Sequence, residues 1–122
     1  MQVAYTVLNT AKPLNASFNS PALPIPNAYG YAIQAVYTGT INGSFKLQAS
    51  ADQYNQLSMQ GTQPPVPTNW TDIASTSVSE TTAGTYIWNV TGAFYNYVRV
   101  VFTDASGGTS TGTVTITANT KA

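Results

Sequence analysis

Hydrophobic residues recur at every second position along most of this chain, which is the pattern of β-strands with one buried face. The segments that show it are 3–7, 31–38, 45–50, 70–73, 77–79, 86–90, 97–102 and 113–118. Turn residues separate these segments, and no stretch of ten residues has a convincing helical period. The pattern predicts an all-β fold, an antiparallel β-sandwich of jelly-roll-like architecture with about eight strands.

Two glycine-containing turns are interpreted as β-hairpins. Asn42-Gly43 follows the strand at 31–38 and precedes the strand at 45–50, and Asn-Gly is a strong hairpin signal. The stretch 107–112 is also rich in glycine, but it lacks the lysine and the strand-to-helix setting of a phosphate-binding loop. We therefore expect a second hairpin there.

Two segments depart from the strand pattern within what we expect to be one domain spanning 1–122. The segment 19–27 holds three prolines, which donate no ladder hydrogen bond, so we expect an extended arm or a sheet edge. The segment 51–68 is a long loop whose Pro-rich part, 63–67, should be stiff and extended. Loops of this length are often functional.

Charge is scarce. Only 7% of the residues are charged, and four basic residues balance four acidic ones. A net charge of zero removes the repulsion that keeps proteins apart, so the composition favours association. Four scattered basic residues form no footprint for nucleic acid. The N-terminus lacks the pattern of a signal peptide, and no apolar run is long enough to span a membrane.

The side chains that carry most enzyme chemistry are absent. The chain has no His and no Cys, which excludes Ser-His-Asp and Cys-His catalysis and removes the preferred ligands of zinc. Paired carboxylates would suffice for glycoside hydrolysis and oxygen ligands for calcium, but Asp52, Asp72, Glu80 and Asp104 are widely separated in the sequence. We expect no catalytic residue, no metal site and no cofactor.

One cation lies in the middle of a strand. Arg99 stands between Val98 and Val100 in the most apolar segment of the chain. A guanidinium buried there needs a partner, and Asp72 and Glu80 are the candidates. We predict a structural ion pair between Arg99 and Asp72.

Aromatic residues beside loops are the best candidates for a contact surface. Trp70 and Trp88 alternate with polar neighbours and are expected in the core. The predicted interaction surface consists of Tyr29, Tyr31, Tyr54, Leu57, Met59, Pro64, Pro65 and Pro67. Such a surface would contact another subunit or a glycan.

Five segments together carry a resemblance to a known group of proteins. They are 34–40, 43–50, 69–73, 88–90 and 97–103. Over 17–121, the chain resembles small β-sandwich proteins encoded in the structural modules of tailed bacteriophages. It departs from their usual pattern by a long segment inserted between Ser50 and Asn69, where a short turn is expected.

The resemblance implies a structural virion protein, a capsid decoration (cement) protein or a related accessory of the head or tail. Its partners would be the major capsid protein or other virion subunits, and it would form a homo-oligomer, with a trimer as the first guess. It would be made in the host cytoplasm and act in the virion without enzymatic activity. The alternative is a carbohydrate-binding module of a head or tail fibre that contacts host surface glycans.

Overall fold

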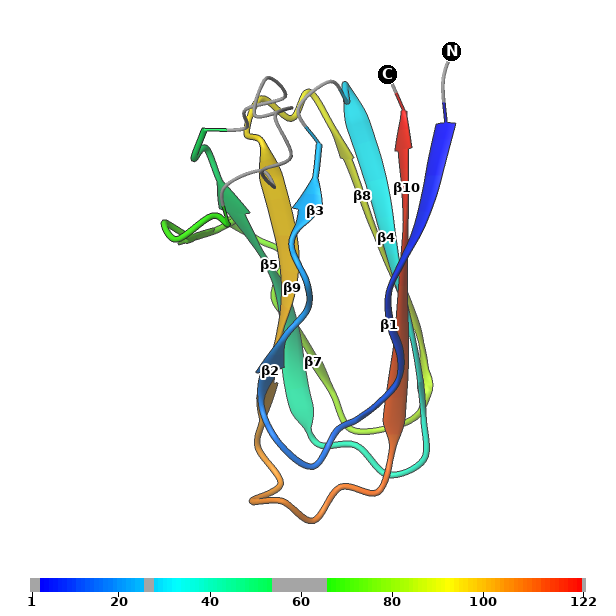
Figure 1. Cartoon of the computed structure of the whole chain (residues 1–122). Helices are drawn as coiled ribbons and strands as arrows, with labels where there is room; N and C mark the ends of the chain where they lie inside the picture. The colour runs from blue at the N-terminus through cyan, green and yellow to red at the C-terminus, as the bar shows by residue number, and fades with distance from the viewer. Residues whose placement is uncertain (1–2, 26–27, 54–65, 122) are drawn as a thin grey trace.

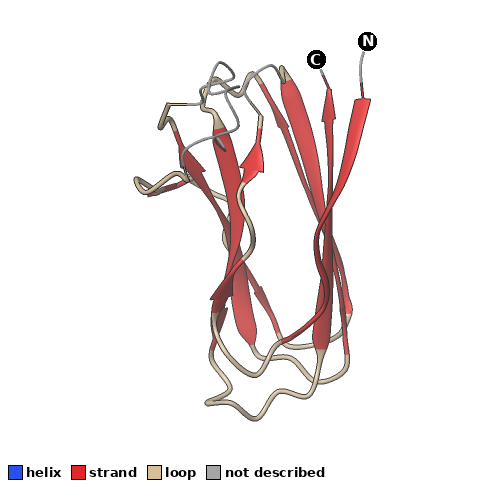
Figure 2. Cartoon of the chain, in the orientation of Figure 1, coloured by secondary structure: helices blue, strands red, loops and turns tan. Residues whose placement is uncertain are grey.

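The computed structural model describes residues 3–25, 28–53 and 66–121, and these residues form strands and loops without a helix (Figure 2). The strands are β1 (Val3–Pro13), β2 (Phe18–Asn19), β3 (Leu23–Pro24), β4 (Gly30–Thr38), β5 (Gly43–Ser50), β6 (Thr71–Asp72), β7 (Val78–Glu80), β8 (Gly84–Thr91), β9 (Tyr97–Asp104) and β10 (Thr113–Lys121). The predicted all-β fold is confirmed. In the described ranges there is also no helix that could span a membrane.

Two antiparallel sheets face each other across the core (Figure 1). One has the order β1-β10-β4-β8, and the other has the order β2-β9-β5-β6, with β3 also on β9 and β7 also on β5. If β2 and β3 are taken as one interrupted strand, and β6 and β7 as another, the described strands number eight. All connections then cross between the sheets except the one that follows β5, which is the strand order of a jelly roll.

Alternating apolar residues from both sheets fill the space between them. On β4 the period-two residues Tyr31, Ile33, Ala35 and Tyr37 are all buried, as the pattern predicts. Opposite them lie the buried residues of β5 and β9: Phe45, Leu47, Val98, Val100 and Phe102.

Four aromatic rings run through this core and connect the two sheets. The ring centroids of Tyr37 and Phe45 are 5.5 Å apart, those of Phe45 and Phe102 are 4.9 Å apart, and those of Phe102 and Phe18 are 5.7 Å apart. We call these four residues the aromatic column. Each pair lies in the range where aromatic contacts add to the free energy gained by burial.

The two predicted hairpins are wrong. β4 and β5 lie in different sheets, and so do β9 and β10, so the turns at 39–42 and 105–112 carry the chain across the sandwich. Gly43 serves a different purpose from the one its Asn-Gly context suggests. A Cβ atom there would lie 2.5 Å from the carbonyl oxygen of Thr103 and 2.6 Å from the ring of Phe102, so the glycine permits a close approach of β5 to β9.

The proline-containing segment lies along one edge of the six-stranded sheet. β2 and β3 each pair with β9 over only two residues, because Pro21 and Pro24 lack the amide that a longer ladder needs. Between them the Ser20 backbone amide donates to the Val100 carbonyl at 2.8 Å, and the Ser20 hydroxyl accepts from the Val100 amide at 2.8 Å. The segment is therefore attached to the core, where Leu23 is buried.

The close approach at Gly43 predicts the effect of adding one methyl group. Gly43→Ala should lower the free energy of unfolding by about 1–3 kcal/mol, because the new Cβ overlaps backbone and ring atoms that are held in the core. Urea or thermal denaturation measures this change. The matched control is Gly84→Ala, whose Cβ would meet the Tyr37 ring at an ordinary 3.5 Å and should change stability by less than about 0.5 kcal/mol. Equal losses of stability in the two variants would contradict the conclusion that Gly43 permits the close approach of β5 to β9.

Candidate functional site

The acidic side chains of the described residues do not converge on one site. Asp72 accepts hydrogen bonds from Lys46 and Gln48, and Asp104 accepts them from Ser106 and Gly108 in the turn after β9. Among the described residues, no group of three His, Cys, Asp or Glu is placed to hold a metal ion. Each of these two carboxylates is therefore hydrogen-bonded to residues on its own strand pair or turn.

Asp52 joins the two ends of the long loop. Its carboxylate accepts hydrogen bonds from the Thr68 amide at 2.7 Å, from the Asn69 amide at 3.0 Å and from the Asn69 side chain at 2.9 Å. These bonds, led by the one from the Asn69 side chain, lower the pKa of Asp52 to about 2. We call this arrangement the Asp52 clamp.

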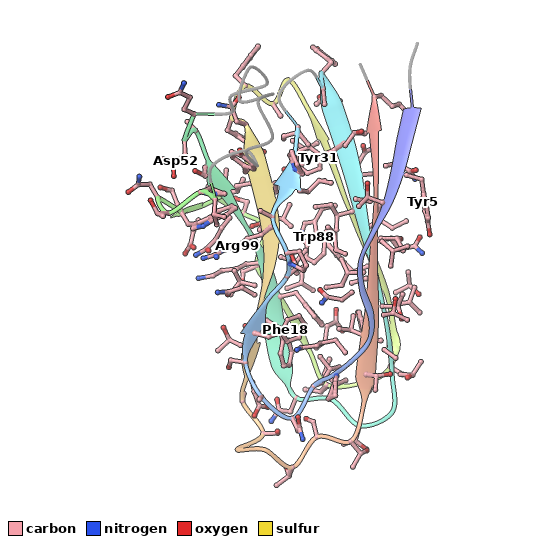
Figure 3. All side chains as sticks on the ribbon, in the orientation of Figure 1. Tyr5, Phe18, Tyr31, Asp52, Trp88 and Arg99 are labelled. Atoms are coloured by element: carbon pink, nitrogen blue, oxygen red, sulfur yellow. The ribbon has the colours of Figure 1, made fainter. Side chains whose placement is uncertain are left out.

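Arg99 does not pair with Asp72. Its Nε and one terminal nitrogen donate to the side-chain oxygen of Gln48 at 2.9 and 2.7 Å, and its guanidinium lies 4.2 Å from the centroid of the Trp70 ring. Asp72 forms its salt bridge with Lys46, at 2.9 Å. The predicted pair was wrong because Arg99 projects from the outer face of the six-stranded sheet (Figure 3). Gln48 on β5 is directly opposite Arg99 in the register of the two strands.

The predicted interaction surface is divided by the structure. Tyr29 is 64% exposed, whereas Tyr31 is 3% exposed, and the hydroxyls of Tyr31 and Tyr95 are 2.6 Å apart. Including Tyr31 was therefore an error, because Tyr31 is the first of the alternating β4 side chains that face the core. Pro67 is also buried. Tyr54, Leu57, Met59, Pro64 and Pro65 lie outside the described residues.

Most of the outer face of the four-stranded sheet is an uncharged surface that the sequence alone did not identify. The side chains that share it by register and alternation are Tyr5 and Val7 on β1, Thr113, Thr115, Thr117 and Asn119 on β10, Ala32, Gln34 and Val36 on β4, and Thr85, Ile87 and Asn89 on β8. None of these side chains is charged; Lys121, the next outward position on β10, is paired with Gly30 at one end of the same sheet face. We call this surface the threonine face.

Large apolar side chains are exposed on the threonine face. Tyr5 is 65% exposed and Ile87 is 54% exposed, and Val7 and Val36 are exposed as well. Figure 3 shows Tyr5 pointing away from the core, whereas Trp88 lies between the sheets. The alternation at 3–7 predicts one buried face, but Tyr5, Thr6 and Val7 are all exposed, so the prediction was wrong for this part of β1.

A trough of about 240 Å³ lies beside Tyr29 on the same sheet. The ends of β4, β8 and β10 that line it are at the end of the sheet where the chain termini lie, and Figure 1 shows this end. The first residues of β4, including Gly30 and Ala32, line it together with the last residues of β8 and β10. Tyr29 is thus the one predicted contact residue among the described ones that the structure places at both an exposed position and a concavity.

The Asp52 clamp predicts how one carboxyl group titrates. We expect a pKa near 2 for Asp52 by NMR titration, and a rise toward the ordinary 3.8 in Asn69→Ala, which removes the largest cause of the shift. Because folding depresses this pKa, the stabilisation is full above the unfolded value of 3.8 and declines as the pH falls toward 2. Asp104, bound by Ser106 and Gly108, is the internal control and should not respond. An unchanged Asp52 pKa in the variant would contradict the clamp.

The sequence matches no protein-family model and no curated protein. Solved structures do share the fold. The chain is similar to the SPBc2 prophage-derived protein YomS, with a TM-score of 0.55 and 10% identity over 98% of this chain and 92% of that one. It is similar to the PBSX exported protein XepA, with a TM-score of 0.59 and 11% identity over 98% of this chain and 37% of XepA.

A third similar structure is that of PirA, with a TM-score of 0.52 and 20% identity over 93% of this chain and 90% of that chain. Sequence identities this low show a common fold, and the functions of these proteins are not transferred to this chain. At that level the resemblance stated from the sequence is confirmed: this chain has the β-sandwich of a prophage-derived protein.

Proposed function

We propose that this protein is a non-enzymatic structural component of a bacteriophage particle, a decoration or cement protein that binds the outside of the capsid and stabilises it. The observation that carries the proposal is the threonine face, a broad sheet surface without charge and with exposed apolar side chains. The fold shared with a prophage-derived protein supports it.

The threonine face has the physical properties of a surface that is buried in an assembly. Covering it removes apolar groups such as Tyr5 and Ile87 from water and leaves no unpaired charge in the contact. Its threonines and valines are β-branched, so they lose little rotamer freedom when a partner immobilises them. A stable interface can therefore form without ion pairs.

Under this proposal the partner is the major capsid protein or another virion subunit. Within an oligomer, modest contacts with the shell add up, since binding of one subunit raises the local concentration for the contact of the next. The protein would act as a homo-oligomer, and the trimer remains the first arrangement to test. Its place of action would be the virion, after synthesis in the host cytoplasm.

A second candidate function is a carbohydrate-binding module of a head or tail fibre that contacts host surface glycans. A specific observation favours keeping it. Tyr29 presents an exposed aromatic ring beside the trough, and aromatic rings next to polar side chains are the usual components of small-molecule sites.

The capsid proposal predicts that charge on the threonine face prevents binding. Ile87→Asp and Val7→Asp should each bind at least about tenfold more weakly to capsids assembled without the protein, because docking would bury an unpaired carboxylate. Co-sedimentation with those capsids measures the loss. Val66→Asp, at a valine that is 81% exposed and lies outside this face, is the matched control and should bind normally.

Circular dichroism establishes first that each variant is folded. Wild-type protein should also raise the temperature at which undecorated capsids open. If the two threonine-face variants bind capsids as well as Val66→Asp does, the threonine face is not the docking surface. If wild-type protein does not bind capsids at all, the capsid proposal itself fails.

A further inference from the structure

The trough beside Tyr29 is formed by the register of three neighbouring strands. In the middle strand β4, Gly30 is paired with Lys121 on β10 and Thr91 on β8. Two residues further on, Ala32 is paired with Asn119 and Asn89. Small residues on the central strand therefore lie between larger polar side chains on both flanking strands.

This arrangement creates a floor and two walls. Adjacent strands are about 4.8 Å apart, so the walls on β8 and β10 stand about 10 Å from each other across β4. The floor at Gly30 and Ala32 presents little more than backbone and one methyl group. A Cβ atom at Gly30 would lie 2.7 Å from the carbonyl oxygen of Val90, so the close packing of β4 and β8 here requires a glycine.

Tyr29 lines the trough next to Gly30, and its backbone is held by hydrogen bonds. Its amide donates to the carbonyl of Lys121 at 2.8 Å, and its carbonyl accepts from the amides of Gly92 at 2.8 Å and Ala93 at 3.1 Å. The ring is nevertheless 64% exposed. An exposed aromatic ring on a fixed backbone loses little conformational freedom when a ligand contacts it, which favours binding.

The side chains around the trough match the groups of a sugar. Asn89 and Asn119 each offer two amide donors and an acceptor, and Thr91 offers a hydroxyl, which suits the paired hydroxyls of a saccharide. The apolar floor and the Tyr29 ring suit the C–H face of a pyranose. A volume of about 240 Å³ is below the usual range for drug-sized ligands and suits a single ring.

Lys121 adds one charge to this set, and none of the described residues that line the trough is acidic. A carboxylate on the bound ring would therefore meet an ammonium group and no opposing acid. We propose that the trough binds one pyranose unit of a saccharide and prefers a unit that carries a carboxylate, as in a uronic acid. The proposal gives the second candidate function a location and a ligand class, and it does not depend on capsid binding.

The test is an NMR titration of the full chain with oligogalacturonate and with maltohexaose. We expect the side-chain amide signals of Asn89 and Asn119 to shift with both, and the acidic oligomer to bind more tightly. Tyr29→Ala should weaken both by about tenfold through loss of the ring contact. Lys121→Gln should weaken only the acidic oligomer, and added salt should have the same selective effect.

Phe94→Ala is the matched control, because Phe94 is a 91% exposed aromatic residue that does not line the trough. It should leave saccharide binding unchanged. The proposal is overturned if neither oligomer shifts the two amide signals, or if Phe94→Ala weakens binding as much as Tyr29→Ala does. It is also overturned if Tyr29→Ala changes self-association in sedimentation and not saccharide binding, since the trough would then hold a second copy of the chain.

The two proposals fail separately. Val7→Asp, on the threonine face but outside the trough, should weaken capsid binding and leave the saccharide shifts intact. Tyr29→Ala should do the reverse. Saccharide binding by a protein that does not bind capsids would leave the carbohydrate-binding function standing alone.

Discussion

The contact between the two sheets through the aromatic column is the interaction on which the rest of the structure depends. Phe45 and Phe102 meet at 4.9 Å because Gly43 offers no side chain where the Phe102 ring lies. Burying rings of this size contributes about 1.5–3 kcal/mol each. Apolar groups alone fill the core at this point. The polar residues of this nearly uncharged chain therefore lie mainly in the connections and on the outer faces.

The hydroxyl groups that dominate the composition serve two structural purposes. Where they are buried, they accept hydrogen bonds from backbone amides: Thr76 from Leu47 at 3.1 Å, and Ser110 from Asn42 at 3.2 Å. These bonds satisfy amides in and beside the strands whose loss of water would otherwise be costly. Where the hydroxyls face outward, as on β10, they form a surface that is polar but carries no charge. One composition thus supports both the fold and the proposed contact surface.

Much of the fold was predictable because period two fixes which side of a strand is buried, as on β4 from Tyr31 to Tyr37. The pairing of strands was not, because a turn such as Asn42-Gly43 reverses the chain without specifying which sheet it enters. The site was harder still. Tyr29 was identified as an aromatic residue beside a loop, but the trough exists only through the alignment of Gly30 and Ala32 with residues some 60 and 90 positions away on β8 and β10. Arg99 was assigned the wrong partner for the same reason, since Gln48 lies opposite it only in the folded sheet.

The Asp52 clamp also affects how this sandwich tolerates change. Asp52 holds Thr68 and Asn69 directly, so the two segments that flank residues 53–67 are joined at one point of the domain. The entropy of closing a loop grows only slowly with its length, by about 0.6 kcal/mol for each doubling. Foreign peptides inserted between residues 53 and 67 would be anchored by the clamp at a fixed place on the domain, and the β-sandwich would serve as a scaffold for peptide display.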